Sequence, residues 1–303
     1  MKKFIVQIVL FLIIGIAVGE VVIRTFNLTI DVPKTYQDKN GLVRYYPNQE
    51  GNYQNGTHTW KVNKYGYSGD APESLNNLIV ILGDSYIENF MNPVSCHQSN
   101  YLKKLLPEYN YFEASRAGAT IFELMETSKG LDTLNPKLQV LYVKSNDFLQ
   151  SLASHNKNVN HVRLDLDKNE ILNAKYKGSI YKDALYNFKF AYYLYRNVWL
   201  ANDENADRNV EDKATDEELP LGEISRLIEY IKKNYKISDK ILVFGPTSDP
   251  RIIKMCNDAG FRTYFLSDKG DKDWKLENDS HWSCYGHERV AGQVKGFIDQ
   301  SLK

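Results

Sequence analysis

The stretch Ile79-Val80-Ile81-Leu82-Gly83-Asp84-Ser85 decides the fold. Four consecutive aliphatic residues before a glycine are typical of a strand buried on both faces, as in a parallel sheet. Gly83 lets the chain turn sharply at the carboxyl end of this strand, the edge where open α/β sheets bind ligands. Ser85 is therefore a candidate nucleophile. The alternative is an ordinary strand-to-helix turn in which Asp84 or Ser85 caps the next helix.

Further strands and helices follow in alternation. Apolar runs predict strands over residues 109–114, 138–143, 241–244 and 261–266. Apolar residues at helical spacing predict helices over residues 99–106, 120–131, 249–259 and 285–300. Alternating strands and helices form right-handed crossovers and a parallel sheet. We therefore expect an α/β fold, a three-layer sandwich around a parallel five-stranded sheet.

The alternation breaks after the third strand. Residues 148–239 are expected to be a helical insertion, with a tyrosine-rich amphipathic helix over 181–200 and another helix over 221–235. Between them, the polar and acid-rich stretch 201–218 predicts a disordered loop. Residues 31–72 are rich in Tyr, Asn and Gly, and we expect residues 25–77 to be an extended segment packed on the main domain, residues 78–303.

The N-terminus is apolar over residues 4–23, broken by Gln7 and Glu20 and preceded by Lys2 and Lys3. About 20 apolar residues cross a bilayer as a helix, and lysines before them favour a cytoplasmic N-terminus. We expect residues 1–24 to be a single transmembrane helix that places the catalytic domain outside the cytoplasm, in a bacterial cell envelope. A cleaved signal peptide is the alternative, because Ala17-Val18-Gly19 offers small residues for cleavage.

Charge and composition exclude other partners. The chain has 38 basic and 38 acidic residues, so no net field favours nucleic acid. The six histidines and three cysteines lack metal-ligand spacing, and we expect neither a metal nor a cofactor.

Cys96 follows the serine loop and Cys284 lies close to His281, so both are expected at the rim of one cleft, whereas Cys256 falls within a helix. If export permits a disulfide, we expect Cys96 to pair with Cys284.

Three more polar clusters follow predicted strands. Asp279-Ser280-His281-Trp282 lies on an expected irregular loop after the fifth strand, where His281 would act as base and Asp279 would orient it. Gly118 follows the second strand and lets a backbone N–H approach a substrate, and the Asn146 amide after the third strand can donate to an oxyanion. The alternative for His281 is an exposed loop histidine with a nearby capping acid, and the other two clusters alone are compatible with plain turns. We nevertheless expect all of them at the carboxyl ends of strands in one sheet.

Together these segments resemble the ordered blocks of the SGNH/GDSL hydrolase superfamily. The resemblance rests on Gly83-Asp84-Ser85, Gly118, Asn146-Asp147 and the Asp279-Ser280-His281-Trp282 block with Gly286-His287, and it covers residues 78–300 apart from the insertion. It implies a flavodoxin-like sandwich and a serine esterase with Ser85 as nucleophile, His281 as base and Asp279 as acid. It also implies an oxyanion hole of the Ser85 N–H, the Gly118 N–H and the Asn146 side chain.

The sequence departs from the family pattern at three places. Lys144 stands where the third block usually has glycine, and Glu113 stands where many relatives have asparagine. The acid three residues before the histidine is replaced by Asn278, whereas Asp279 matches the Asp-x-His-Trp variant of SGNH-like proteins of polysaccharide O-acetylation. Asp279 is therefore the expected acid, with Asn278 as a minor alternative.

The resemblance implies an extracytoplasmic esterase that acts on ester-linked acyl groups, O-acetyl above all, of carbohydrate. Transfer of the acyl group to an envelope glycan by the same serine is an alternative, since both reactions share an acyl-enzyme. A further alternative is an inactive glycan-binding or envelope-binding pseudoenzyme, which Lys144 and the unusual acid spacing would favour. The sequence leaves the oligomeric state open.

Overall fold

The computed structural model describes residues 2–176, 178–199, 219–269, 273–277 and 279–302. The chain forms two compact units. The larger unit comprises residues 35–49, 60–176 and 219–303, and it holds every candidate site residue. The smaller unit comprises residues 1–34, 50–59 and 177–218.

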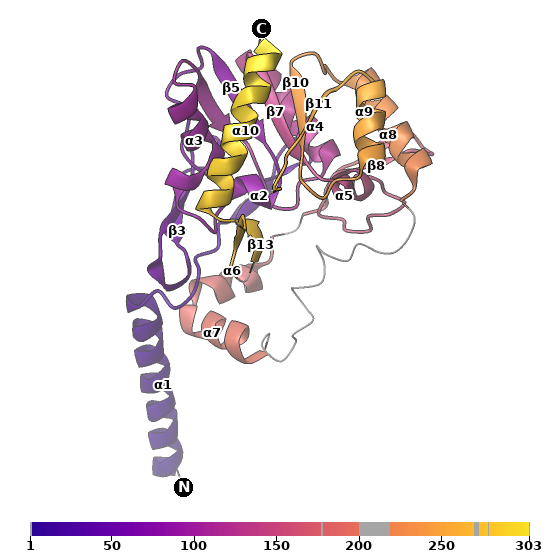
Figure 1. The fold of residues 1–303 in the computed structure, drawn as a ribbon. Coiled ribbons are helices and arrows are strands. Elements are labelled where there is room, and N and C mark those ends of the chain that lie inside the picture. The colour runs from indigo at the N-terminus through magenta and orange to yellow at the C-terminus, as the bar shows by residue number, and fades with distance from the viewer. Residues whose placement is uncertain (1, 177, 200–218, 270–272, 278, 303) are drawn as a thin grey trace. The chain divides into compact units, whose positions relative to one another are not determined.

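The larger unit is built on a five-stranded sheet in the order β11-β10-β7-β5-β6 (Figure 1). Its strands are β5 (Leu78–Leu82), β6 (Asn110–Glu113), β7 (Leu138–Val143), β10 (Lys240–Phe244) and β11 (Arg262–Phe265). All neighbouring strands of this sheet are parallel. In chain order the arrangement is 2-1-3-4-5, that of flavodoxin-like folds, whose ligands bind where the strand order reverses, between β5 and β7.

Alternation along the buried strands divides the core into two layers. In β5, Leu78, Val80 and Leu82 face one apolar cluster, and Ile79 and Ile81 face the other. The first cluster lies under α4 (Ile121–Leu131), α5 (Ser145–Gln150), α8 (Leu221–Asn234) and α9 (Pro250–Asp258). The second lies under α3 (Gln98–Leu105) and α10 (Cys284–Leu302), which pack against each other. The three-layer α/β sandwich predicted from the sequence is confirmed.

Several predicted elements differ in detail. The helix that follows Gly83 is only one turn, α2 (Ser85–Glu88), because Asn89 adopts a left-handed conformation with φ 57° and ends it. The segment after the fifth strand is not an irregular loop. It forms an antiparallel pair of β12 (Lys275–Leu276) with β13 (Asp279–Trp282).

Residues before β5 contribute short strands, namely β1 (Thr35–Gln37), β2 (Val43–Tyr45), β3 (Gln49–Asn52) and β4 (Thr59–Val62), and one turn of 3₁₀ helix, η1 (Gln54–Gly56). β1 and β2 pair in antiparallel fashion. Tyr45, Trp60 and Val62 are buried in a small cluster with Phe90, which lies just after the serine turn. This part of the N-terminal segment therefore packs on the elements that carry the candidate nucleophile.

The insertion is less helical than expected. It contains a hairpin of β8 (Arg163–Asp165) and β9 (Glu170–Leu172), and α8 belongs to the larger unit. The continuous helix predicted over 181–200 is wrong, because the chain leaves the helical conformation at Phe188, with φ −95° and ψ 87°. Two helices, α6 (Ile180–Asn187) and α7 (Lys189–Leu194), take its place, followed by a π-helical turn, η4 (Tyr195–Trp199). The loop expected over 201–218 lies outside the described residues.

The smaller unit contains α1 (Lys2–Thr25) with α6 and α7. α1 has 24 residues, and its mean hydropathy reaches 2.7 over an 18-residue window. By length and composition it can cross a membrane.

Candidate active site

Ser85 stands where β5 ends and α2 begins. The Asp84 side chain caps α2 by accepting the Tyr86 N–H at 3.0 Å. A Cβ on Gly83 would lie 2.5 Å from Cγ1 of Ile87, so only glycine allows this tight passage from strand to helix. Asp84 thus caps the helix, as one of the two interpretations expected, and the nucleophile assignment of Ser85 stays a prediction.

His281 and Asp279 complete a hydrogen-bonded chain to Ser85. Nε2 of His281 lies 2.7 Å from the Ser85 Oγ, and Nδ1 lies 2.5 Å from the Asp279 Oδ1. The backbone N–H of His281 also donates to the Asp279 Oδ1 at 3.0 Å. Residues i and i+2 of a strand point to the same face, which is how β13 brings both side chains together. Asn278 lies outside the described residues.

The charge on Asp279 is favoured by this arrangement. Partial burial alone would raise the pKa of Asp279, but hydrogen bonds from the backbone and ring of His281 outweigh it and hold the pKa below its ordinary value of 3.8. Asp279 is therefore an anion at neutral pH. An anion on Nδ1 keeps the proton on that nitrogen, which leaves Nε2 free to accept the proton of Ser85.

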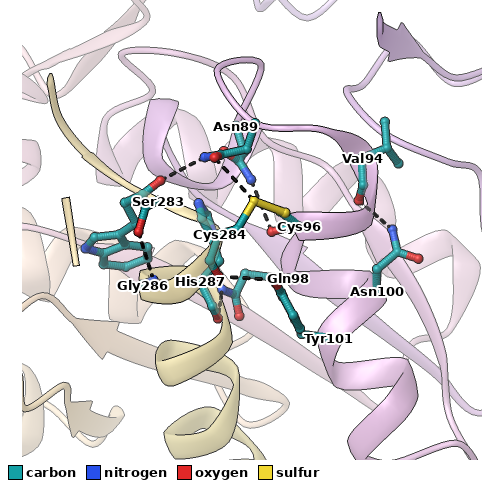
Figure 2. Close-up of a disulfide and its surroundings, with 12 residues drawn as sticks. Asn89, Val94, Cys96, Gln98, Asn100, Tyr101, Ser283, Cys284, Gly286 and His287 are labelled. Atoms are coloured by element: carbon teal, nitrogen blue, oxygen red, sulfur yellow. Dashed lines mark hydrogen bonds between the residues drawn. A yellow bond between two sulfur atoms is a disulfide. The ribbon is translucent and has the colours of Figure 1, made fainter. Parts of the chain in front are cut away.

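β13 is tied to the serine side of the site by three links. The Tyr86 hydroxyl donates to the Ser280 carbonyl at 3.0 Å, and the Asn92 side chain donates to the Trp282 carbonyl at 2.8 Å. The third link is a disulfide between Cys96 and Cys284, with a Cα–Cα distance of 5.0 Å (Figure 2). These links hold His281 against Ser85 although the two residues are 196 positions apart. The expected pairing of Cys96 with Cys284 is present, and Cys256 is free and buried.

The segment after β6 passes beside the serine turn. The Arg116 N–H donates to the Gly83 carbonyl at 3.2 Å, and the Ala117 N–H donates to the Glu88 carboxylate at 2.7 Å. Gly118 follows with φ +69°, a conformation that favours glycine. Asn146 is exposed in the first turn of α5, directly after β7, the strand next to β5. The structure thus brings the second and third sequence blocks to the strand end that carries Ser85.

Three hydrogen-bond donors in these segments are unused. Among the described residues, the backbone N–H groups of Ser85 and Gly118 and the side-chain amide of Asn146 have no acceptor. Unpaired donors near a nucleophile are what an oxyanion requires. The three donors predicted for the oxyanion hole are thus unpaired in the described part of the chain, and their role stays a prediction.

Two charged residues support the site without having been expected from the sequence. The ammonium of Lys144 pairs with the Asp84 carboxylate at 2.8 Å and lies 4.5 Å from the centre of the Tyr86 ring. The Tyr86 ring in turn contacts the His281 ring, with centroids 4.7 Å apart. Burial would lower the pKa of Lys144, but Asp84 and Asp147 raise it more, so the ammonium stays charged. Lys144, which stands where the family pattern has glycine, thus stabilises the turn at Ser85 through Asp84 and Tyr86.

Glu88 is the second of these residues. Besides the Ala117 N–H it accepts the Tyr45 hydroxyl at 2.6 Å, and it is completely buried. Burial raises its pKa from 4.5 to about 6, because hydrogen bonds and Arg116 only partly offset the loss of solvation. No sequence signal identified Glu88, since it follows the serine on a one-turn helix and its partners lie far away in the chain.

Other polar residues near the site have structural partners. Glu113 accepts Nδ1 of His97 at 2.7 Å and the Ser99 N–H at 2.7 Å, which fixes the start of α3. His287 is buried, and burial lowers its pKa to about 3, so its ring is neutral. Figure 2 shows Gln98 bound to His287, from Nε2 to the carbonyl at 2.9 Å. Within the described residues there is no group of three or more His, Cys, Asp and Glu that could hold a metal ion.

No family model matches the chain, and no curated protein matches it. Solved structures do resemble it. The crystal structure of TesA has 13% identity and a TM-score of 0.41, over 74% of this chain and 99% of that chain. The psychrotrophic esterase EstA from Pseudoalteromonas sp., inhibited by monoethylphosphonate, has 12% identity and a TM-score of 0.40, over 74% of this chain and 100% of that chain.

A putative lipolytic protein of G-D-S-L family from Desulfitobacterium hafniense DCB-2 has 9% identity and a TM-score of 0.37, over 73% of this chain and 99% of that chain. At TM-scores below 0.5, no residue role is transferred from any of these structures. In the order of its motifs, the topology of its sheet and the arrangement of Ser85, His281 and Asp279, the chain resembles the SGNH/GDSL hydrolase superfamily.

Proposed function

We propose that this protein is a serine esterase. The observation that carries the proposal is the continuous chain Asp279, His281, Ser85, in which each ring nitrogen of the histidine has the partner that general-base catalysis requires. Its position at the carboxyl edge of the sheet, beside the point where strand order reverses, is where a substrate of this fold class binds.

In the proposed mechanism the Ser85 oxygen attacks the carbonyl carbon of an ester while Nε2 of His281 takes the hydroxyl proton. The carbonyl oxygen becomes an oxyanion, which accepts hydrogen bonds from the unused donors on Ser85, Gly118 and Asn146. As the carbonyl re-forms, the bond to the alcohol breaks, and His281 returns its proton to the leaving oxygen. The result is an acyl-serine and a free alcohol.

Water then completes the cycle. His281 takes a proton from the water, whose oxygen attacks the acyl carbon, and the released Ser85 oxygen recovers that proton as the carboxylic acid leaves. Asp279 stays ionised throughout and stabilises the imidazolium that forms twice in each cycle.

We further propose that the substrate is an O-acyl carbohydrate, O-acetyl above all, encountered outside the cytoplasm. The support is the Asp279-Ser280-His281-Trp282 block, which resembles that of polysaccharide O-acetylation proteins, together with the apolar N-terminal helix. Transfer to a glycan hydroxyl is the second candidate, because the same block is shared with proteins of O-acetylation and a sugar hydroxyl can replace water as the acceptor. The complete hydrogen-bonded chain disfavours an inactive pseudoenzyme.

Hydrolysis of p-nitrophenyl acetate by the detergent-purified full chain tests the esterase proposal. We expect turnover by the native protein and by Ser225→Ala, an exposed serine on α8, and none above background for Ser85→Ala. Equal turnover in all three proteins would reject it. Adding an acceptor glycan distinguishes transfer, which gives acylated glycan, from hydrolysis, which gives free acid only.

A further inference from the structure

The smaller unit joins α1 to the insertion helices through an acidic residue in the apolar helix. The Glu20 carboxylate accepts the backbone N–H groups of Lys189 at 3.2 Å and Phe190 at 2.7 Å. These N–H groups open α7, where no earlier helical turn supplies acceptors, and a carboxylate complements the positive end of a helix. This contact also explains why the helix breaks at Phe188: the new helix start is stabilised by Glu20.

Close packing reinforces the contact. A Cβ on Gly19 would lie 2.7 Å from the Phe190 ring, so the glycine lets α7 approach the backbone of α1. Arg24 pairs with Glu20 at 2.6 Å and donates to the Asn187 carbonyl at 2.6 Å. Figure 1 shows α7 beside the C-terminal end of α1. The last turns of α1 are therefore part of a folded unit with α6 and α7.

The remainder of α1 has no such cover. Its apolar side chains from Phe4 to Val18 are exposed, for example Phe11 at 74% and Leu12 at 60%. Exposed apolar surface of this extent, on a helix long and apolar enough to cross a membrane, is what a bilayer would cover.

Apolar and aromatic side chains of α6, α7 and the turn after them are exposed as well. Tyr181 is 88% exposed, and Phe188, Leu194 and Tyr195 are 42%, 42% and 37% exposed. The basic residue Lys182 is exposed in the same segment. Aromatic rings and basic side chains at the end of an apolar helix are the residue types that prefer the headgroup region of a membrane.

We propose that α6 and α7 form a membrane-interface platform, bound to the end of α1 through Gly19, Glu20 and Arg24, with Tyr181, Phe188 and Tyr195 contacting lipid. This inference rests on the expectation, drawn from the sequence, that α1 anchors the chain in a membrane. Because α7 is attached at Glu20, where the apolar stretch meets its first charge, it lies at the depth of the lipid headgroups. The same contacts favour retention of α1, since cleavage near Gly19 would remove the surface on which α7 packs.

An environment-sensitive fluorophore tests the proposal on the full chain in vesicles of neutral and anionic phospholipid. Cys96 and Cys284 are paired, and burial raises the pKa of the free Cys256 to about 12, so a single introduced cysteine is labelled selectively. Labels are placed by Tyr181→Cys on α6, Ile13→Cys on α1 and Lys254→Cys on α9. Spin-labelled lipids with the quencher near the headgroups or deep in the chains report the depth of each label.

We expect the label at 13 to be quenched by the deep quencher, and the label at 181 to shift to shorter wavelength and to be quenched by the shallow one. The label at 254 supplies the background. Quenching at 13 without quenching at 181 overturns the platform and leaves the anchor in place. No quenching at either position overturns both. Energy transfer between copies at 181, without lipid quenching, would assign the surface to a second copy instead.

Two glycine variants test the attachment. Gly19→Leu places a side chain against Phe190, whereas Gly15→Leu is a matched control because nothing lies within 4 Å of its Cβ position. We expect Gly19→Leu to lose the shallow quenching at 181 while the label at 13 stays quenched, and Gly15→Leu to keep both. Unchanged quenching at 181 in both variants would contradict the proposed attachment. Hydrolysis by the Ser85 site is assayed separately, so failure of the esterase proposal is distinguishable.

Discussion

Asp279 and His281 lie on one face of strand β13, with 2.5 Å between the carboxylate Oδ1 and the ring Nδ1. Strand geometry, not loop flexibility, creates this contact, because the side chains of residues i and i+2 point the same way. The pairing of β13 with β12, the Tyr86 and Asn92 hydrogen bonds and the disulfide then fix the strand relative to Ser85.

The acid is tested by Asp279→Asn. Asparagine keeps the shape but removes the charge and permits the wrong histidine tautomer, so we expect turnover of p-nitrophenyl acetate to fall by up to about 10⁴-fold. Asn278→Ala serves as the comparison and is expected to have a mild effect. The opposite ranking would make Asn278 the residue that orients His281, and mild effects from both would indicate a Ser-His dyad.

The oxyanion hole is tested by Asn146→Ala. Loss of one donor typically lowers turnover by about 10²–10³-fold, with little effect on folding for an exposed side chain. Asn160→Ala, at another exposed asparagine, is the matched control and should retain native turnover. Native turnover in Asn146→Ala would place the third donor elsewhere.

The disulfide is tested by the double substitution Cys96→Ser with Cys284→Ser. The bridge joins residues 188 positions apart, and removal of such a constraint typically costs about 2–5 kcal/mol. We expect a lower midpoint of urea unfolding and, because Cys284 follows β13, lower turnover as well. Cys256→Ser is the control for replacing a cysteine, although it also perturbs a buried site. The free thiols of the unreduced native protein are therefore counted by titration as well. A count of three free thiols would show that Cys96 and Cys284 are not bonded.

The buried carboxylate of Glu88 predicts a pH dependence of stability. Its pKa in the folded chain is about 6 against an ordinary 4.5, so the folded state binds the proton more tightly. The stability that Glu88 contributes is therefore fully present below pH 4.5 and is lost as the pH rises through about 6. The loss is about 2 kcal/mol, because one pKa unit corresponds to about 1.4 kcal/mol.

Glu88→Gln removes that ionisation and keeps an oxygen for the Tyr45 and Ala117 donors. At each pH we take the free energy of unfolding of Glu88→Gln minus that of the native protein. We expect this difference to be about 2 kcal/mol larger at pH 7.5 than at pH 4, because only the native protein loses stability between the two. Urea unfolding followed by tryptophan fluorescence measures both differences. An equal difference at the two pH values would show that Glu88 keeps an ordinary pKa.

Much of the larger unit was predictable because its signals are local. The apolar runs that became β5 and β7 are buried on both faces. The Thr120 side chain caps α4 by accepting the Glu123 N–H, and the Glu123 carboxylate accepts the Thr120 N–H in return. Ser85, His281, Asp279, Gly118 and Asn146 stood out because each follows a recognisable strand. The structure brings Ser85, His281 and Asp279 into hydrogen-bonding contact.

What could not be predicted depends on partners distant in sequence. The break at Phe188 reflects Glu20, which lies 169 and 170 positions from the N–H groups that it binds. The sequence showed Lys144 only as a departure from the family pattern that would favour an inactive protein, whereas the structure pairs it with Asp84 across neighbouring strands. Glu88 acquires its role from Tyr45 and Ala117. In each case the contact joins residues that are distant in the sequence, so no periodicity in the sequence reports it.

We propose above that Ser85 is a nucleophile activated by His281. Labelling of the full chain with a fluorophosphonate probe tests it directly, since the probe forms a covalent bond with an activated serine. We expect a single labelled peptide containing Ser85 in the native protein, no labelling of Ser85→Ala or of heat-denatured protein, and strongly reduced labelling of His281→Ala. Labelling that persists in Ser85→Ala, or that is absent from the folded native protein, would contradict it.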